Sequence, residues 1–295
     1  MSAIATRAIA VGLAVLAGGA AVAGSAAAAT RDVPSQTSSN WAGYAVTGID
    51  TSTTDPNTGE VTTTPSTTTF STVSGAWTQP RAACSVGSRS YSAFWVGLGG
   101  FADGSQALEQ IGTESDCTAG GRASYAVWYE LVPDAPVTVN LKLFPGDTVS
   151  ANVAVSGQSV TVKLKNVTRK KTFTRVLAMT ATPDVSSAEW VAEAPSACLS
   201  SRGCFPLSLT NFGTVAFRTA NATTSDGYTG TISDASFAPT AVLLQGGSGG
   251  FFSDRFGPMA VTADATPSAL SSDGSSFSVS WAQSTGSGPV PAPLP

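Results

Sequence analysis

The chain has 295 residues, of which only 12% are charged, and a formal net charge of −4. It contains no histidine, which excludes a Ser-His-Asp or Cys-His hydrolase and any zinc site built on imidazole. Nucleic acid is not expected as a partner, because the only basic run, Arg169–Lys171, is typical of a solvated strand end. Any chemistry must therefore use carboxylates, amides, hydroxyls or lysine.

The first 29 residues have the layout of a secretory signal peptide. Arg7 supplies a positive charge, an uncharged Ala-, Val- and Gly-rich run follows, and residues 25–29 are small, as a signal peptidase requires. An uncleaved membrane anchor is the alternative, but the run is poor in Leu and Ile and no basic flank follows it. We therefore expect a secreted, extracellular protein that has no membrane association after cleavage near Ala29.

The rest of the chain is expected to form one domain, residues 30–285, followed by a flexible Pro-rich tail, residues 286–295. Thr47–Thr69 is Thr-rich with a turn sequence inside it, which predicts a long surface excursion. Gly246–Gly250 predicts a loop for the same compositional reason. Neither segment is expected to contribute to the core.

Apolar and polar residues alternate along 137–143, 149–155 and 160–164, with turn residues between these segments. This period of two predicts an antiparallel meander with one buried face, and no window has a helical period. The fold class expected is all-β, an antiparallel β-sandwich of two large packed sheets. Further strands are expected at Phe70–Thr78, Ser92–Leu98, Ala123–Leu131, Thr172–Met179, Ala188–Glu193, Gly213–Arg218, Ala241–Gln245 and Ser275–Trp281.

Four cysteines in an exported chain predict two disulfides. Cys198 and Cys204 enclose a short loop and are natural partners, which leaves Cys84 with Cys117. The sequence also allows the other two connectivities. Two disulfides leave no thiolate for a nucleophile or a metal site.

Carboxylates among apolar strand residues are unusual in a chain with so little charge. Glu130 follows Trp128 and a tyrosine, and Glu189 and Glu193 flank a tryptophan and share one strand face because their separation is even. A glutamate in a strand is ordinarily a solvent-exposed side chain. Large rings beside these three acids instead predict desolvation, which raises a carboxyl pKa towards a catalytically useful value.

The segment 107–112 contains one further pair of polar residues. Glu109 stands beside Gln110, and adjacent strand residues point to opposite faces, so only one of these two side chains can line a given cleft.

Seven short segments occur in an order that is typical of one enzyme family. They are N-W-A-G-Y (40–44), V-S-G-A-W-T-Q-P (73–80), W-V-G-L-G-G (95–100), A-L-E-Q-I-G (107–112), Y-A-V-W-Y-E (125–130), A-E-W-V-A-E (188–193) and N-F-G-T-V-A-F (211–217). Through this series the chain resembles the glutamic peptidases called eqolisins.

The resemblance implies a β-sandwich whose catalytic pair lies on the concave face of one sheet. It implies that Glu193 is the general base and acid, and that Gln110 stabilises the oxyanion. Roles in substrate binding or support fall on Trp41, Trp95, Trp128, Glu130 and Glu189. We expect a monomer that cleaves proteins or peptides at acidic pH, and the sequence gives no evidence for a metal or an organic cofactor.

One residue departs from the family pattern. Gly99 stands where the family often has Asp, so the hydrogen bond of that carboxylate must be lost or replaced. Two other functions remain open from the residues alone: a carbohydrate-binding sandwich, and a glycoside hydrolase that uses Glu130 and Glu193. Gln110 distinguishes a peptidase from both alternatives, because only a peptidase needs an oxyanion donor at that position.

Overall fold

The computed structural model describes residues 32–102, 104–199, 203–246 and 263–284, within one compact unit. In this part of the chain no helix is long and apolar enough to cross a membrane. The predicted signal peptide, the predicted Pro-rich tail and residues 247–250 of the predicted Gly-rich loop lie outside the described residues. The strands are β1 (Ser35–Ser38), β2 (Trp41–Gly48), β3 (Thr51–Thr54), β4 (Val61–Thr64), β5 (Phe70–Thr78), β6 (Ala93–Gly99), β7 (Leu108–Cys117), β8 (Ala123–Val132), β9 (Val137–Val139), β10 (Thr148–Ser156), β11 (Ser159–Asn166), β12 (Lys171–Ala178), β13 (Ser187–Glu193), β14 (Ser196–Leu199), β15 (Gly203–Pro206), β16 (Thr214–Thr224), β17 (Thr229–Thr231), β18 (Phe237–Leu244), β19 (Ala263–Pro267) and β20 (Phe277–Gln283).

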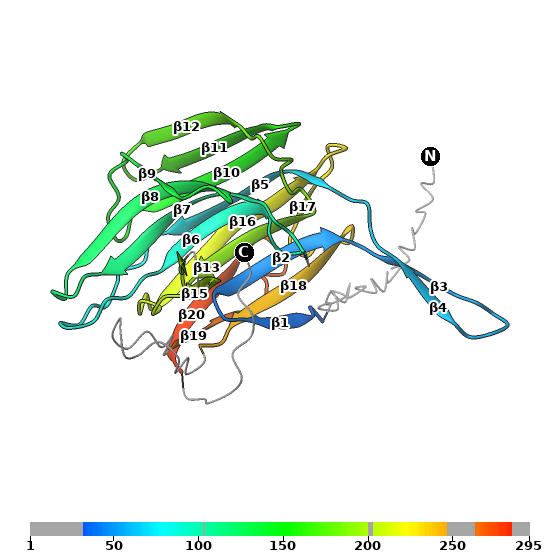
Figure 1. The fold of residues 1–295 in the computed structure, drawn as a ribbon, viewed down its shortest axis with the longest axis horizontal. Coiled ribbons are helices and arrows are strands. Elements are labelled where there is room, and N and C mark those ends of the chain that lie inside the picture. Colours follow the sequence, from blue (N-terminus) through cyan, green and yellow to red (C-terminus); the bar gives the residue numbers. More distant parts are fainter. Residues whose placement is uncertain (1–31, 103, 200–202, 247–262, 285–295) are drawn as a thin grey trace, which may run out of the picture. The chain divides into compact units, whose positions relative to one another are not determined.

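Hydrogen bonds join most of these strands into one continuous sheet, in the order β12-β11-β10-β5-β16-β20-β19-β18-β2-β13-β6-β7-β8-β9 (Figure 1). The sheet folds over itself, because β10 contacts β6 and β7, and β11 contacts β7, although these strands are far apart in that order. The two halves therefore pack as the layers of a β-sandwich, and the predicted fold class is confirmed.

The core lies between the two layers and consists of the alternate residues that the strand periodicity indicated. Val149, Ala151 and Val153 of β10 belong to it, together with aromatic rings from the facing layer. Two buried tryptophans also bond across the layers. Trp77 Nε1 donates to Thr113 Oγ1 at 2.9 Å, and Trp190 Nε1 donates to a carbonyl of β5 at 2.7 Å. Paired indole N–H groups make these rings compatible with complete burial.

Two members of the predicted meander are confirmed, because β10 and β11 pair in sequence order, and the separately predicted strand at 172–179 is β12, which pairs with β11. The first predicted member, 137–143, does not pair with β10. The expected strand along 137–143 is shorter than the alternation suggested and ends at Val139. The physical reason is topological: β9 pairs with β8 in one layer, whereas β10 pairs with β5 in the other. Residues 140–147 therefore cross between the layers, and Leu143 is buried there without strand pairing.

The Thr-rich segment 47–69 was expected to be a surface excursion, and its centre is an exposed hairpin of β3 and β4. Every residue of both strands is exposed, and they form a separate two-stranded sheet. The hairpin leaves the main sheet after β2 and returns to it at β5 (Figure 1).

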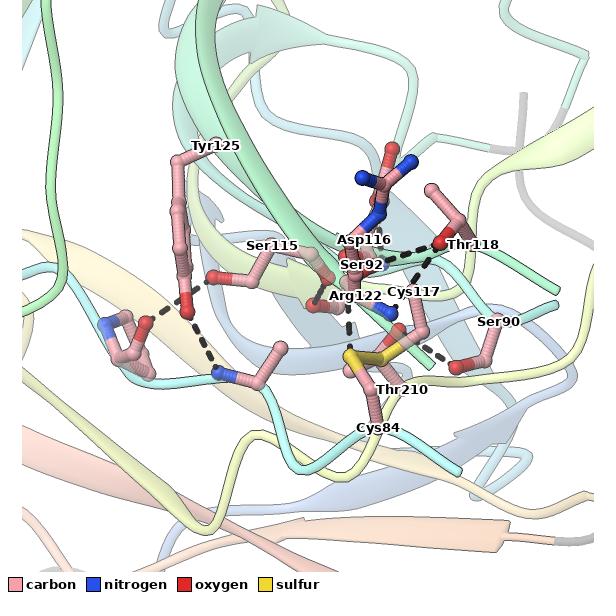
Figure 2. Close-up of a disulfide and its surroundings, with 12 residues drawn as sticks. Cys84, Ser90, Ser92, Ser115, Asp116, Cys117, Thr118, Arg122, Tyr125 and Thr210 are labelled. Atoms are coloured by element: carbon pink, nitrogen blue, oxygen red, sulfur yellow. Dashed lines mark hydrogen bonds between the residues drawn. A yellow bond between two sulfur atoms is a disulfide. The ribbon is translucent and has the colours of Figure 1, made fainter. Parts of the chain in front are cut away.

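The disulfide between Cys84 and Cys117 confirms one of the two predicted pairings. It joins the segment before β6 to the last residue of β7, and Figure 2 shows the hydroxyl-rich surroundings of the bond. Ser92 Oγ donates to the Ser115 carbonyl at 2.8 Å, and the backbone N–H of Ala82 donates to the Tyr125 hydroxyl at 3.2 Å. These contacts fix the end of β7 at which the hairpin to β8 begins.

The second predicted pairing falls partly outside the described residues. Cys204 is disulfide-bonded, and the strand register places it opposite Cys198. The side chain of Cys198 is not among the described ones.

All five lysines of the chain lie between residues 142 and 171. Lys163 and Lys165 of β11 are exposed, whereas the residues between and beside them, Val162 and Leu164, belong to the core. The lysines of β11 therefore point away from the core, on the outer surface of the layer that contains β10, β11 and β12.

Candidate active site

The strand register places all seven candidate site residues on one face of the sheet. Glu193 of β13 pairs with Trp41 of β2, and Gln110 of β7 pairs with Glu130 of β8. Because paired residues share a face and alternate residues return to it, the following residues form one surface, here called the site face: Trp41, Trp95, Gln110, Trp128, Glu130, Glu189 and Glu193. This face is turned away from the core, since Trp190 and Phe94 point the other way.

Small residues make room for the ring of Trp95 on the site face. A Cβ at Gly112 would lie 2.6 Å from Cβ of Trp95, and a Cβ at Gly97 would lie 3.0 Å from its six-membered ring. The same Cβ at Gly97 would lie 3.3 Å from Cβ of Gln110. The glycines of the W-V-G-L-G-G and A-L-E-Q-I-G motifs therefore let the indole lie along the sheet.

Glu193 is held by an indole hydrogen bond. Trp95 Nε1 donates to Glu193 Oε2 at 2.7 Å, and Trp41 packs edge-on against Trp95 with their ring centroids 4.9 Å apart. Burial raises the pKa of Glu193 to about 8; the bond from Trp95 opposes this rise, and the charge of Glu130 adds to it. The carboxyl of Glu193 therefore keeps its proton to a higher pH than an ordinary glutamate does.

Gln110 and Glu130 form the second hydrogen-bonded unit of the site. Gln110 Nε2 donates to Glu130 Oε2 at 2.8 Å, and Gln110 is almost completely buried. Burial raises the pKa of Glu130 to about 7, against the lowering effect of the bond from Gln110. An amide nitrogen carries two hydrogens, so one remains available for a developing oxyanion after the bond to Glu130 is made.

Trp95 lies between these two units. Gln110 is paired with Gly97 of β6, whereas Glu193 is paired with Ala93, which lies four residues earlier in the same strand. The ring of Trp95 covers the interval, since it contacts the space above Gly97 and bonds to Glu193. The charge of Glu130 also reaches Glu193, so the two units are electrostatically coupled.

Glu189 is on the site face, opposite Gly97 and at the level of Gln110, but its environment differs from that of Glu193. Glu189 is completely buried, whereas Glu193 is partly exposed and accepts a hydrogen bond from Trp95. Burial raises its pKa well above the ordinary value. Glu109 is also completely buried, and burial raises its pKa to about 8. Both acids are therefore neutral over a wide pH range.

The tryptophans of the site face are buried, and the polar side chains lie among them. Trp41 and Trp95 have no exposed surface, and Trp128 is also buried, in a cluster with Leu108 and Val191. Glu130 and Glu193 retain partial exposure. Among the carboxyls of the site face, Glu130 and Glu193 are thus the two that a substrate can reach, and their pKa values are raised.

Asp184 occupies the space beside Gly99, the position at which the family often has an aspartate. A Cβ at Gly99 would lie 2.6 Å from Cβ of Asp184. The carboxylate of Asp184 accepts hydrogen bonds from Ser105 and from the backbone of Gly100 and Ser186. Sequence reasoning missed Asp184 and Ser105, because no motif contains them and only the fold brings them to Gly99.

No group of three or more histidine, cysteine, aspartate or glutamate side chains in the described part of the chain is arranged to hold a metal ion. The site that the structure does present is built from two carboxyls, one amide and the indoles around them.

The family model described as Peptidase A4 matches residues 55–248. The chain belongs to the Peptidase A4 family. The predicted resemblance is confirmed, and this family member is a glutamic endopeptidase, as its motif series indicated. No curated protein sequence matches the chain significantly.

Two solved structures of glutamic peptidases share the fold of this Peptidase A4 member. Scytalido-glutamic peptidase with a transition state analog inhibitor is 21% identical, with a TM-score of 0.59 over 83% of this chain and 98% of that chain. SCP-B, a member of the Eqolisin family in a complex with the tripeptide Ala-Ile-His, is 21% identical, with a TM-score of 0.56 over the same shares.

Proposed function

We propose that the protein is an exported endopeptidase that cleaves peptide bonds with Glu193 and Gln110. The observation that carries this proposal is the coupling of two hydrogen-bonded units on one face: Glu193 on Trp95, and Gln110 on Glu130. The first unit supplies a proton acceptor of raised pKa, and the second supplies a buried N–H donor on the same face.

The reaction follows from the chemistry of the two side chains. Glu193, as the carboxylate, takes a proton from water, whose oxygen attacks the carbonyl carbon of the scissile bond. The free N–H of Gln110 donates to the oxyanion that forms. The protonated Glu193 then gives its proton to the leaving nitrogen, the C–N bond breaks, and a carboxylic acid and an amine are released. Glu193 ends in its starting state.

The raised pKa values set the proposed pH range. Glu193 must be ionised to accept a proton from water, and its raised pKa moves this ionisation above 4.5. Once ionised, a carboxylate of raised pKa is a stronger base than an ordinary one, and its acid form still protonates an amine readily. Activity is thus expected to rise with pH towards about 8, the pKa of Glu193, and not to peak at the acidic pH expected from the sequence.

Gln110→Ala tests the oxyanion role. We expect kcat to fall by about 10²–10³-fold with KM nearly unchanged, because the lost donor acts mainly in the transition state. The measurement is hydrolysis of denatured casein, and of a fluorogenic peptide for rate constants, from pH 2 to 8. Parallel assays with polysaccharides test the alternatives: glycan hydrolysis or binding without proteolysis would replace the peptidase proposal, and an unchanged kcat would remove Gln110 from the dyad.

Glu130→Gln tests the coupling of the two carboxyls. The neutral amide keeps an oxygen that can accept from Gln110, but it removes the charge that raises the pKa of Glu193. The acid limb of the kcat/KM profile should therefore move to lower pH. Glu60→Gln, in the exposed segment between β3 and β4, is the matched control and should leave the limb in place. A limb that stays fixed or moves upward in Glu130→Gln would contradict the coupling.

A further inference from the structure

Gly99 can have no side chain while Asp184 keeps its place. A Cβ at Gly99 would lie 2.6 Å from Cβ of Asp184, 2.9 Å from its Cγ and 2.7 Å from its carbonyl oxygen. The φ angle of Gly99 is 82°, which also favours glycine. The turn that ends β6 is therefore built around the side chain of Asp184.

Asp184 connects two segments that are far apart in the sequence. Its Oδ1 accepts the backbone N–H of Ser186 at 2.9 Å, which fixes the chain just before β13. Its Oδ2 accepts the hydroxyl of Ser105 and the backbone N–H of Gly100 at 3.3 Å, in the connection from β6 to β7. Ser105 Oγ in turn lies 3.0 Å from the carbonyl of Ala107, next to the first residue of β7.

The two segments joined by Asp184 lead directly to the proposed catalytic pair. Gln110 is the third residue of β7, and Glu193 is the last residue of β13. Strand β6 lies between these two strands in the sheet. Asp184 therefore links the ends of the strands that carry the amide and the carboxyl, at the end of the sheet nearer to Gln110.

The ionic state of Asp184 fits such a linking role. Desolvation acts against its charge, but the hydrogen bonds from Ser105, Ser186 and Gly100 outweigh it, so the pKa of Asp184 is lowered. Its nearest acidic neighbours behave oppositely: burial first, and then the charge of Asp184, raise the pKa of Glu109 and of Glu189. One member of this acidic group is thus a permanent hydrogen-bond acceptor, and the other two are neutral.

We propose that Asp184 is a positioning residue of the peptidase: by tying the β6–β7 connection to the start of β13, it fixes the place of Gln110 relative to Glu193. The proposal rests on the proposed function, in which Gln110 stabilises the oxyanion. In this chain the carboxylate next to Gly99 thus comes from Asp184, in a segment that is distant in the sequence.

Asp184→Asn is the test variant, because it keeps the size of the side chain but turns one acceptor oxygen into a donor. Asp273→Asn is a matched control in the connection between β19 and β20. Asp273 likewise accepts bonds from neighbouring serines, Ser271 Oγ at 2.6 Å and Ser275 Oγ at 2.9 Å, and it has no contact with the site face. Both substitutions are made in the full chain, alone and together with Gln110→Ala.

If Asp184 acts through Gln110, Asp184→Asn lowers kcat by about ten- to a hundredfold with KM changed less than about threefold. In the Gln110→Ala background the same substitution should cost less than about threefold, because the donor that it positions is already gone. The side-chain amide NMR signals of Gln110, assigned by their loss in Gln110→Ala, should shift in Asp184→Asn and stay in place in Asp273→Asn.

An unchanged kcat, an equal loss in both backgrounds, or unmoved Gln110 signals in Asp184→Asn would overturn the positioning role. A failure of the proposed function looks different: the wild-type chain would not cleave peptides, or it would keep its activity in Glu193→Gln. In that case the NMR comparison still decides whether Asp184 sets the position of Gln110.

Discussion

Glu193→Gln is expected to lower kcat/KM for peptide hydrolysis by about 10⁴-fold, the upper end of the range for a general base, because this side chain serves as base and then as acid. The glutamine has nearly the same shape, and its oxygen can still accept the bond that Trp95 Nε1 makes to Glu193 at 2.7 Å. It cannot take a proton from water. The loss should therefore be one of chemistry and not of folding.

The measurement is steady-state hydrolysis of a fluorogenic peptide, with the melting temperature as a check on folding. Glu189→Gln is the informative comparison, since Glu189 lies on the same strand and face but is completely buried. We expect its loss to be far smaller. If Glu189→Gln abolished activity while Glu193→Gln retained it, the base would be the first glutamate of the A-E-W-V-A-E motif and not the second.

A rise of pH from about 4.5 to about 8 is expected to destabilise the fold strongly. Burial raises the pKa of Glu109 and Glu193 to about 8 and that of Glu130 and Asp116 to about 7, and it raises that of Glu189 further above its ordinary value. Each group binds its proton more tightly in the folded chain than in the unfolded one. The stability that they contribute is complete below the unfolded pKa and is lost as the pH rises through the folded pKa.

Aspartates whose pKa is lowered act in the opposite direction, and Asp147 and Asp184 are two of them. Despite desolvation, hydrogen bonds from Arg169 and Asn166 lower the pKa of Asp147, and serine donors lower that of Asp184. Their contribution is present above the unfolded value of 3.8 and is lost as the pH falls below it. Maximum stability is therefore expected at about pH 4–5.

Calorimetric melting from pH 3 to 8 tests the expected curve. Each buried carboxyl of raised pKa contributes a slope of up to about 1.4 kcal/mol per pH unit between its unfolded and folded pKa values. Glu109→Gln should flatten the fall of the melting temperature above pH 5, since Glu109 lies outside the proposed dyad and titrates only in that range. A melting temperature that is constant from pH 5 to 8 would contradict the raised pKa values.

Much of the fold could be predicted because strands with one buried face leave a period of two in the sequence. The strand predicted at Phe70–Thr78 matches β5 at both ends. Strand β2 was missed as a strand, because Trp41–Gly48 is buried almost throughout and shows no alternation. Strand β9 ends early because the chain crosses between layers after Val139, which no local pattern reveals.

The site divides in the same way. The resemblance implied that Gln110 and Glu193 share one face, because the motifs that carry them are local properties of the sequence. The acceptor beside Gly99 could not be predicted, because Asp184 reaches it only through the pairing of β13 with β6. The complete burial of Trp41 and Trp95 is likewise a consequence of packing and not of any motif.

The placement of the lysines has a practical consequence for handling the protein. Lys163 and Lys165 point outward from one layer, whereas Glu193 and Gln110 lie on the outer face of the other layer. Amine-reactive dyes or resins that attach through lysine side chains can react only between residues 142 and 171. Coupling through Lys163 or Lys165 would therefore attach the protein by one layer and leave the site face, on the other layer, turned away from the support.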